Sequence, residues 1–491
     1  MTSKLLPPVQ GPSPDSDFMF RMNHRILGQQ LFVSIALGLP VLGALVLSLR
    51  TNDFLPLTIC VFVEIVLCIL LLKPQSLVNY FLMFGYFFFP GNLGKIGGLV
   101  TLNWLRISVL AILFTLLSVV TMKHFRIRKG SYIEYAFFLT SMPWIFYIGL
   151  TIFWAISPLD AMRYYPKLFF CLAVSMALLL MEDIRTQDAV RYLLVGGLMF
   201  AIAATPFKVE QWNTSDVAWF TGVFGRHSPK FALTFIVMFS LTTAMSRIHR
   251  RLSLTTFILS LAWLSLLLQR GAMLALAFGG IALWILSMDK IKFSRLVQAA
   301  VFAMFVGMLS FTMLYNSSFS TYMFVPHRGP HDLFMALLSG DFQGAVDVIN
   351  FKGRLEMWGY AMQLGVSFLG AGMGSSAYYM RGMFGRIYEI HNDHLAYLLD
   401  GGLLGYSLFW LMWVGMAGMA WHYRKSVDNL TRTLAILMGA YGAGLFIWSI
   451  VDHVISYADA SIAYLYILAA LLVKRQRELG STIPRTETIE A

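Results

Sequence analysis

Apolar windows of roughly 20 residues recur along almost the whole chain, each long enough to cross a bilayer core of about 30 Å. Inside a membrane every backbone N–H and C=O group needs an internal partner, which only helices and closed β-barrels provide. The ten-residue alternation typical of barrel strands is absent from the sequence. Only 13% of the residues are charged, whereas soluble domains carry about 25%. We therefore predict an all-α polytopic membrane protein.

The hydropathy pattern predicts about 14 transmembrane helices, within a range of about 12–14. They cover residues 31–49, 54–72, 77–90, 100–121, 132–156, 168–181, 191–206, 229–246, 254–269, 271–288, 296–315, 402–421, 433–450 and 460–473.

These helices divide the chain into five parts. The tail 1–30, rich in Pro, Ser and Asp, is expected to be disordered. The loop 316–401, rich in aromatic residues, Gly and Met, is expected to pack as a small helical cap. The three cysteines lie inside apolar runs, where buried small side chains are the expected role. The parts are the tail 1–30, helices 1–11 in 31–315, the large loop 316–401, helices 12–14 in 402–473 and the tail 474–491.

Lysine and arginine predict the orientation, because cytoplasmic connections carry an excess of both. Dense basic runs occupy one set of alternate connections and the C-terminal tail, at 123–129, 247–251, 290–295, 422–425 and 474–477. We therefore expect both termini in the cytoplasm and the large loop outside. The net charge of +12 reflects this topology and not nucleic-acid binding, because the charges are scattered between hydrophobic segments.

The outer face receives an unusual set of polar residues. Each cation there would pass individually as an interfacial anchor, but together they suit an anionic, lipid-linked substrate handled outside the cytoplasm. The set comprises Arg163, Lys167, Arg226, His227, Arg270, Asp452 and His453.

Two arginines are candidate anion ligands. Arg270 interrupts a long apolar run, so we expect a tight turn there; its guanidinium either reaches the interface as a helix cap or binds phosphate oxygens bidentately. Arg354, in KGRLEMW, has a possible surface partner in Glu356.

The glycines of GAGMGSS at 370–376 predict a tight turn near the membrane, because a nucleotide loop would need a preceding strand and a Lys.

Four polar residues directly precede an apolar run: His391, Asn392, Asp393 and His394. A neutral imidazole such as that of His391 can accept a proton from a hydroxyl nucleophile. Alternatively, Asn392 or Asp393 caps the helix that follows, and His391 and His394 are polar loop residues. A metal site that adds Asp452 and His453 is a third alternative; it would need three or four converging ligands, and we assign no metal.

The motifs, in this order, resemble the bacterial O-antigen ligase and Wzy-type polymerase superfamily of membrane glycosyltransferases. The resemblance covers roughly 220–420, whereas the N-terminal helices match only in hydropathy. The family usually has Ser where this chain has Gln269. The matching pieces are GRHSPKFAL at 225–233, QRGA at 269–272, GRLEMW at 353–358, GAGMGSS at 370–376 and HNDHLAYLLDGGLLGYSLF at 391–409.

The resemblance implies a GT-C-like helical fold in the bacterial cytoplasmic membrane and a reaction at its outer face. Such enzymes move a glycan from undecaprenyl diphosphate to an acceptor hydroxyl without a metal or other cofactor. By position, Arg270 and Arg354 would bind the diphosphate and His391 would be essential. We add Arg226 to the diphosphate ligands. Further substrate contacts are assigned to Arg163, Lys167, His227, Asn392, Asp393 and His394.

We expect inversion, because no carboxylate is clearly placed as a covalent nucleophile, with Asp393 as the one candidate for that role. We expect a polymerase of O-antigen or exopolysaccharide repeat units because of the chain length, the extra helices and the loop 316–401, which could hold a second lipid-linked glycan. A ligase that uses lipid A-core as acceptor is the first alternative. A flippase and a structural scaffold are alternatives from other classes. Expected partners are the lipid-linked glycan, the acceptor, the bilayer and a chain-length regulator or export complex.

Overall fold

A computed structural model describes the C-terminal two thirds of the chain most completely. Within the described residues every regular element is helical. The predicted helices 31–49, 54–72 and 296–315 lie outside these residues, and 77–90 and 100–121 lie almost entirely outside them. The described residues are 78–79, 81–82, 111, 115, 132–181, 183–203, 228–267, 270–288, 335–336, 338–341, 344, 352–384, 390–454, 457–458 and 461–482.

The described helices fall into two groups in chain order. Those before the large loop are η3 Tyr132–Tyr135, α6 Ala136–Leu150, η4 Thr151–Trp154, α7 Pro158–Leu180, α8 Thr186–Ala203, α10 Ser228–Met245, α11 Arg250–Leu267 and α12 Arg270–Leu286. Those from the loop onward are α17 Lys352–Gln363, α18 Ser375–Phe384, α19 Asp393–Asp400, α20 Gly402–Tyr423, α21 Asn429–Val451 and α22 Ile462–Thr482.

Four helical stretches are long and apolar enough to cross a membrane: Tyr132–Trp154, Asp160–Leu180, Gly402–Tyr423 and Asn429–Val451. Shorter apolar helices cover Lys230–Met245 and Gly271–Leu286. The described part of the chain is therefore a helical membrane protein, as predicted. The count of about 14 depends partly on residues outside those described.

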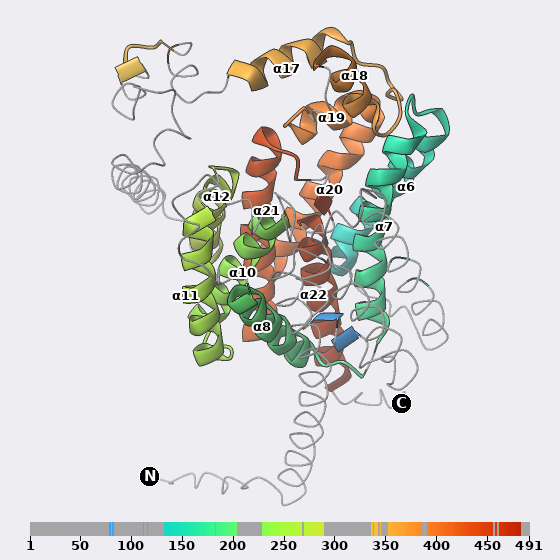
Figure 1. Ribbon diagram of the computed structural model, residues 1–491. Helices are drawn as coiled ribbons and strands as arrows, with labels where there is room; N and C mark the ends of the chain where they lie inside the picture. The colour runs from blue at the N-terminus through green and yellow to red at the C-terminus, as the bar shows by residue number, and fades with distance from the viewer. Residues whose placement is uncertain are drawn as a thin grey trace, which may run out of the picture.

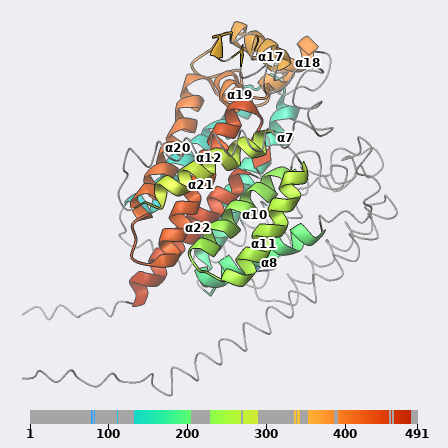
Figure 2. The ribbon, with the colours of Figure 1, turned by 90° about the vertical axis from the view of Figure 1, so that its left-hand side faces the viewer.

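The long helices form a bundle in which α12 packs on α21, α6 on α20, α10 on α11 and α7 on α22. Helices α21 and α22 lie at its centre, where nearly every apolar side chain of α22 from Ile462 to Val473 is buried. The three short helices α17, α18 and α19 cover one end of the bundle, and the two perpendicular views agree on this (Figures 1 and 2). We call these three helices the cap.

Two helices extend beyond their predicted ends. Helix α7 begins at Pro158 and not at 168, and α22 continues to Thr482 and not to 473. Hydropathy missed the first turns of α7 because they carry Arg163 and Lys167, although the Lys167 ammonium lies over the rings of Tyr164 and Tyr457, 5.9 and 5.2 Å from their centroids.

The last turns of α22 remain helical because their cations bind the ends of other elements. Lys474 donates to the carbonyls of Leu178 and Met181 at the end of α7. Arg475 makes a two-pronged contact with Asp428, the N-cap of α21, at 3.0 and 2.9 Å. The end of the bundle away from the cap is thus held by basic side chains that satisfy carbonyl and carboxylate oxygens.

The turn 370–376 joins the cap to the bundle. Gly370, Gly372 and Gly374 have positive φ angles, as the sequence pattern predicts for a tight turn. The Asp400 carboxylate accepts the backbone N–H groups of Gly374 and Ser376 at 2.8 and 2.6 Å. This glycine turn therefore binds an anion that belongs to the chain itself.

We expect Gly372→Ala to destabilise the protein by ~2 kcal/mol or more, because a Cβ atom would meet the backbone of Ala155 and Thr151 at a φ of +93°. Thermal unfolding of purified protein measures the loss. Gly382→Ala is the matched control, because it lies in α18 with no atom within 4 Å of its added Cβ. Equal melting temperatures for the two variants would contradict this packing.

Candidate functional site

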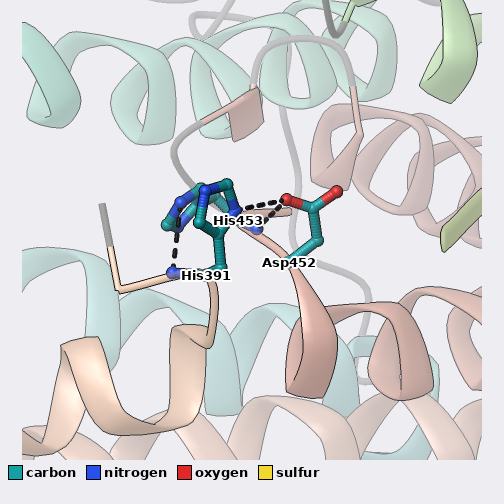
Figure 3. Close-up of side chains that lie close together, drawn as sticks. All are labelled: His391, Asp452 and His453. Carbon is teal, nitrogen blue, oxygen red and sulfur yellow. Dashed lines mark hydrogen bonds and ion pairs between the residues drawn. The ribbon is translucent and has the colours of Figure 1, made fainter. Parts of the chain in front are cut away.

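A buried carboxylate, Asp452, lies at the cap end of α21 and accepts hydrogen bonds from four sides. Its Oδ2 atom receives the Lys230 ammonium at 2.8 Å and the Trp448 indole N–H at 3.2 Å. Its Oδ1 atom lies 3.1 Å from His391 Nδ1 and 3.0 Å from the backbone N of His453. Elements far apart in the sequence, namely α10, α21 and the segment before α19, meet at this one side chain (Figure 3 shows its two histidines).

The charges of this cluster follow from burial and proximity. Burial alone would raise the pKa of Asp452, but the Lys230 charge and the His391 hydrogen bond hold it well below its usual value. Burial lowers the pKa of His453 far below its usual value, and the neighbouring His391 adds to this effect. The cluster therefore contains an ionised Asp452 next to a neutral His453.

His391 is held in one tautomer. Because the ionised Asp452 can only accept, His391 must donate its Nδ1–H, which leaves a lone pair on Nε2. The His391 side chain is 27% exposed and is thus not sealed inside the protein. A histidine oriented by a carboxylate in this way is the base of many hydroxyl-activating sites.

His453 fixes the backbone of His391. His391 has a φ of +52°, a left-handed conformation that costs energy for a residue with a side chain. His453 Nε2 accepts the His391 backbone N–H at 3.2 Å, and the two rings lie 4.2 Å apart (Figure 3). His453 thus supports both the strained backbone of His391 and, through its own N–H, the carboxylate that orients it.

The other residues of the predicted stretch have structural partners. Asn392 is the N-cap of α19 and accepts the Leu395 N–H at 3.0 Å, as the capping alternative predicts. Asp393 is buried and accepts the Val454 N–H at 2.8 Å. His394 lies apart from Asp452, with Nδ1 3.2 Å from Tyr406 Oη and Nε2 3.1 Å from Ser449 Oγ.

Arg354 and the start of α12 lie at the same end of the bundle. Arg354 donates to the carbonyl of Val451, the residue before Asp452, and burial lowers its pKa while the Asp452 charge opposes this. Arg270 begins α12, and the next residue, Gly271, packs so closely on Trp448 that a Cβ atom would not fit. Arg270 therefore lies one residue before Gly271, which packs on Trp448. Trp448 in turn donates a hydrogen bond to Asp452.

The remaining predicted site residues are only partly described. Arg163 lies in the first turns of α7 and its side chain lies outside the described residues, as does that of Arg270. Arg226 and His227 lie wholly outside them. Lys167 is described, and its ammonium lies over two tyrosine rings.

Three groups at the site could act together as metal ligands: His391, Asp452 and His453, whose ligand atoms lie within 4.8 Å of one another. The sequence-based metal hypothesis also included His394, which does not join them. The Lys230 cation already pairs with Asp452, and one ring nitrogen of each histidine is engaged in a hydrogen bond. These contacts suit a proton-transfer network better than a divalent cation.

Sequence reasoning missed Lys230 and Trp448. Lys230 sits in a motif that was noted, at the predicted start of an apolar helix, and a cation at that position was the available signal. The sequence places Asp452 and His453 on the outer face and offers them as metal ligands, but it does not identify Asp452 as the partner of His391. Their roles depend on α21 and α19 meeting, which hydropathy does not encode.

No family model matches the chain, and no curated protein matches it. The functional argument therefore depends on the chemistry of the site and on the quoted motifs.

We expect Lys230→Met to destabilise the protein by about 3–5 kcal/mol, because it leaves a buried carboxylate without its cation. The double variant Lys230→Met/Asp452→Asn removes both charges and should recover part of the melting temperature. Arg432→Met, an exposed change at the opposite end, is the control. A double variant no more stable than the single one would contradict this pairing.

We expect acid to destabilise the protein partly through His394. Burial lowers the pKa of His394 to about 4, against 6.5 for an unburied histidine. Between these values the unfolded chain binds a proton that the folded protein excludes, so stability is lost as pH falls through that window.

Melting temperatures at pH 8 and pH 5, compared between the wild-type protein and His394→Gln, isolate this contribution. Asp400, whose pKa burial raises to about 7, acts in the opposite direction but is common to both proteins. An equal acid-induced shift in both would exclude His394 as the cause.

Proposed function

We propose that this protein transfers a glycan from a polyprenyl diphosphate carrier to a hydroxyl group of an acceptor glycan at the outer face of the bacterial cytoplasmic membrane. The observation that carries the proposal is the pair formed by His391 and Asp452, which leaves His391 Nε2 as a base beside the cations Lys230 and Arg354. The resemblance of 225–233, 269–272, 353–358 and 391–409 to membrane glycosyltransferases points to the same chemistry.

In the proposed reaction the acceptor oxygen attacks the anomeric carbon of the donor glycan. The bond from that carbon to the diphosphate oxygen breaks, and the electron pair leaves with the lipid diphosphate. His391 Nε2 takes the hydroxyl proton, and Asp452 stabilises the resulting imidazolium. One displacement inverts the anomeric configuration.

Cations would stabilise the charge that grows on the leaving group. Arg354 and Lys230 lie around Asp452, and the Arg270 backbone lies next to Trp448 at the same end. Fixed cations in a partly buried site can replace a metal ion in this role. Lys230 is shared with Asp452, so Arg270 and Arg354 are the better candidates for the diphosphate, with Arg226 as a third.

The orientation follows from charge. The basic segments 247–251, 422–425 and 474–477 belong to the end of the bundle away from the cap. If these face the cytoplasm, as the positive-inside rule predicts, the site faces outside. The cap would then lie over the reaction site, where an exported, lipid-linked glycan is present.

We expect His391→Gln and Asp452→Asn to lower the transfer rate by about 10²–10⁴-fold, because one removes the base and the other its orienting carboxylate. The assay uses protein in nanodiscs with a polyprenyl-diphosphate-linked glycan and detects product by mass spectrometry. His422→Gln, an exposed histidine at the opposite end, is the matched control. Wild-type rates in both site variants, with unchanged melting temperatures, would exclude this mechanism.

We favour a polymerase of exported repeat units over a ligase, because the loop 316–401 is long enough in sequence to contribute a site for a second lipid-linked glycan. Lipid-linked repeat units supplied alone distinguish the two. Chain growth supports the polymerase, whereas product formed only after lipid A-core is added supports the ligase. Bond formation in detergent, where no compartments exist, would exclude a flippase.

A further inference from the structure

The segment 366–369, between α17 and α18, exposes apolar side chains although it is not helical. Val366, Phe368 and Leu369 are 43%, 63% and 50% exposed. No charged residue occurs between Glu356 and Arg381, so nothing in the sequence around this segment favours water over an apolar surrounding. A run of large exposed apolar groups of this kind marks an interaction surface.

Three backbone carbonyl groups of this segment find donors inside the protein. The carbonyl oxygens of Ser367 and Phe368 accept the N–H groups of Leu403 and Leu404 at 3.2 and 3.1 Å. The carbonyl oxygen of Leu369 accepts the Tyr147 hydroxyl at 2.9 Å. Pairing of this kind lowers the cost of placing non-helical backbone next to lipid.

The same contacts complete the first turn of α20. The first N–H groups of a helix have no partner within it, and those of Leu403 and Leu404 find theirs in the segment. The segment is therefore fixed to the starting end of a membrane span, at the position along that span where the bilayer interface is expected.

The exposed side chains continue a surface that belongs to two spans. Helices α6 and α20 pack on each other, and both carry large exposed apolar side chains along their length. The exposed apolar side chains nearest to 366–369 lie at the cap end of α6 and α20. The others follow along each helix at helical spacing. They are Leu139, Phe146 and Leu150 on α6, and Leu403, Leu411 and Val414 on α20.

We propose that 366–369 is a membrane-embedded anchor whose side chains contact the acyl chains of phospholipids at the outer boundary of the hydrocarbon core. Its occupant is the bilayer itself, because the apolar surface is continuous with that of two membrane spans. The anchor fixes the height of the cap relative to the membrane, and with it the height of His391. This inference does not depend on the reaction proposed above.

The test uses a fluorescent NBD label at Phe368→Cys, in protein whose three cysteines are replaced by alanine and which is held in phospholipid nanodiscs. We expect lipid-borne nitroxide quenchers to reduce its emission roughly twofold and aqueous iodide to have little effect. Val414→Cys on α20 is the lipid-facing control, and Glu356→Cys on α17 is the water-facing control, since both side chains are exposed.

Iodide quenching at 368 equal to that at 356 would overturn the anchor, because the segment would then face water. If neither quencher acts at 368 and two Phe368→Cys chains form a disulfide with each other, a second copy of the protein covers the segment. That result would also overturn the anchor. Glycan transfer is not measured, so either result leaves the proposed reaction to its own test.

Discussion

The ion pair between Lys230 and Asp452 organises the site end of this protein. Two charges that are almost fully removed from water can coexist only when each satisfies the other and the remaining lone pairs find donors. Asp452 meets that condition with Trp448, His391 and the His453 backbone. As a result, α10, α21 and the segment before α19 must meet at one point. The same carboxylate that requires this packing also sets the tautomer of His391, so structural and chemical roles share one group.

The cap depends on a second buried carboxylate. Asp400 closes the glycine turn 370–376 through two backbone N–H groups, while 366–369 completes the first turn of α20. Backbone groups that would be unpaired in a membrane are thereby paired across the junction of cap and bundle. His391 lies nine residues before Asp400, on the segment that leads into α19. Precise placement of the base therefore follows from how the cap is attached.

Hydropathy located the spans well where they are uniformly apolar, as in α20 and α21. It failed at α7 and α22, where charged turns remain helical because Lys167 packs over tyrosine rings and Lys474 binds the end of α7. Within the site, the stretch around His391 and the arginine Arg354 could be selected from the sequence. Lys230 could not, because a lysine at the start of an apolar helix looks like an interfacial anchor until its partner is known.

By itself, the sequence determined that this chain is a helical membrane protein, where its basic clusters occur along the chain, and that polar residues gather at 391–394. These properties depend on local composition and periodicity, which any short window contains. Only the tertiary structure decided that Asp452 and not His394 partners His391, and that the glycine turn binds Asp400 and not an external anion. Those pairings join residues 24 to 61 positions apart. They arise from helix packing, which no local pattern specifies.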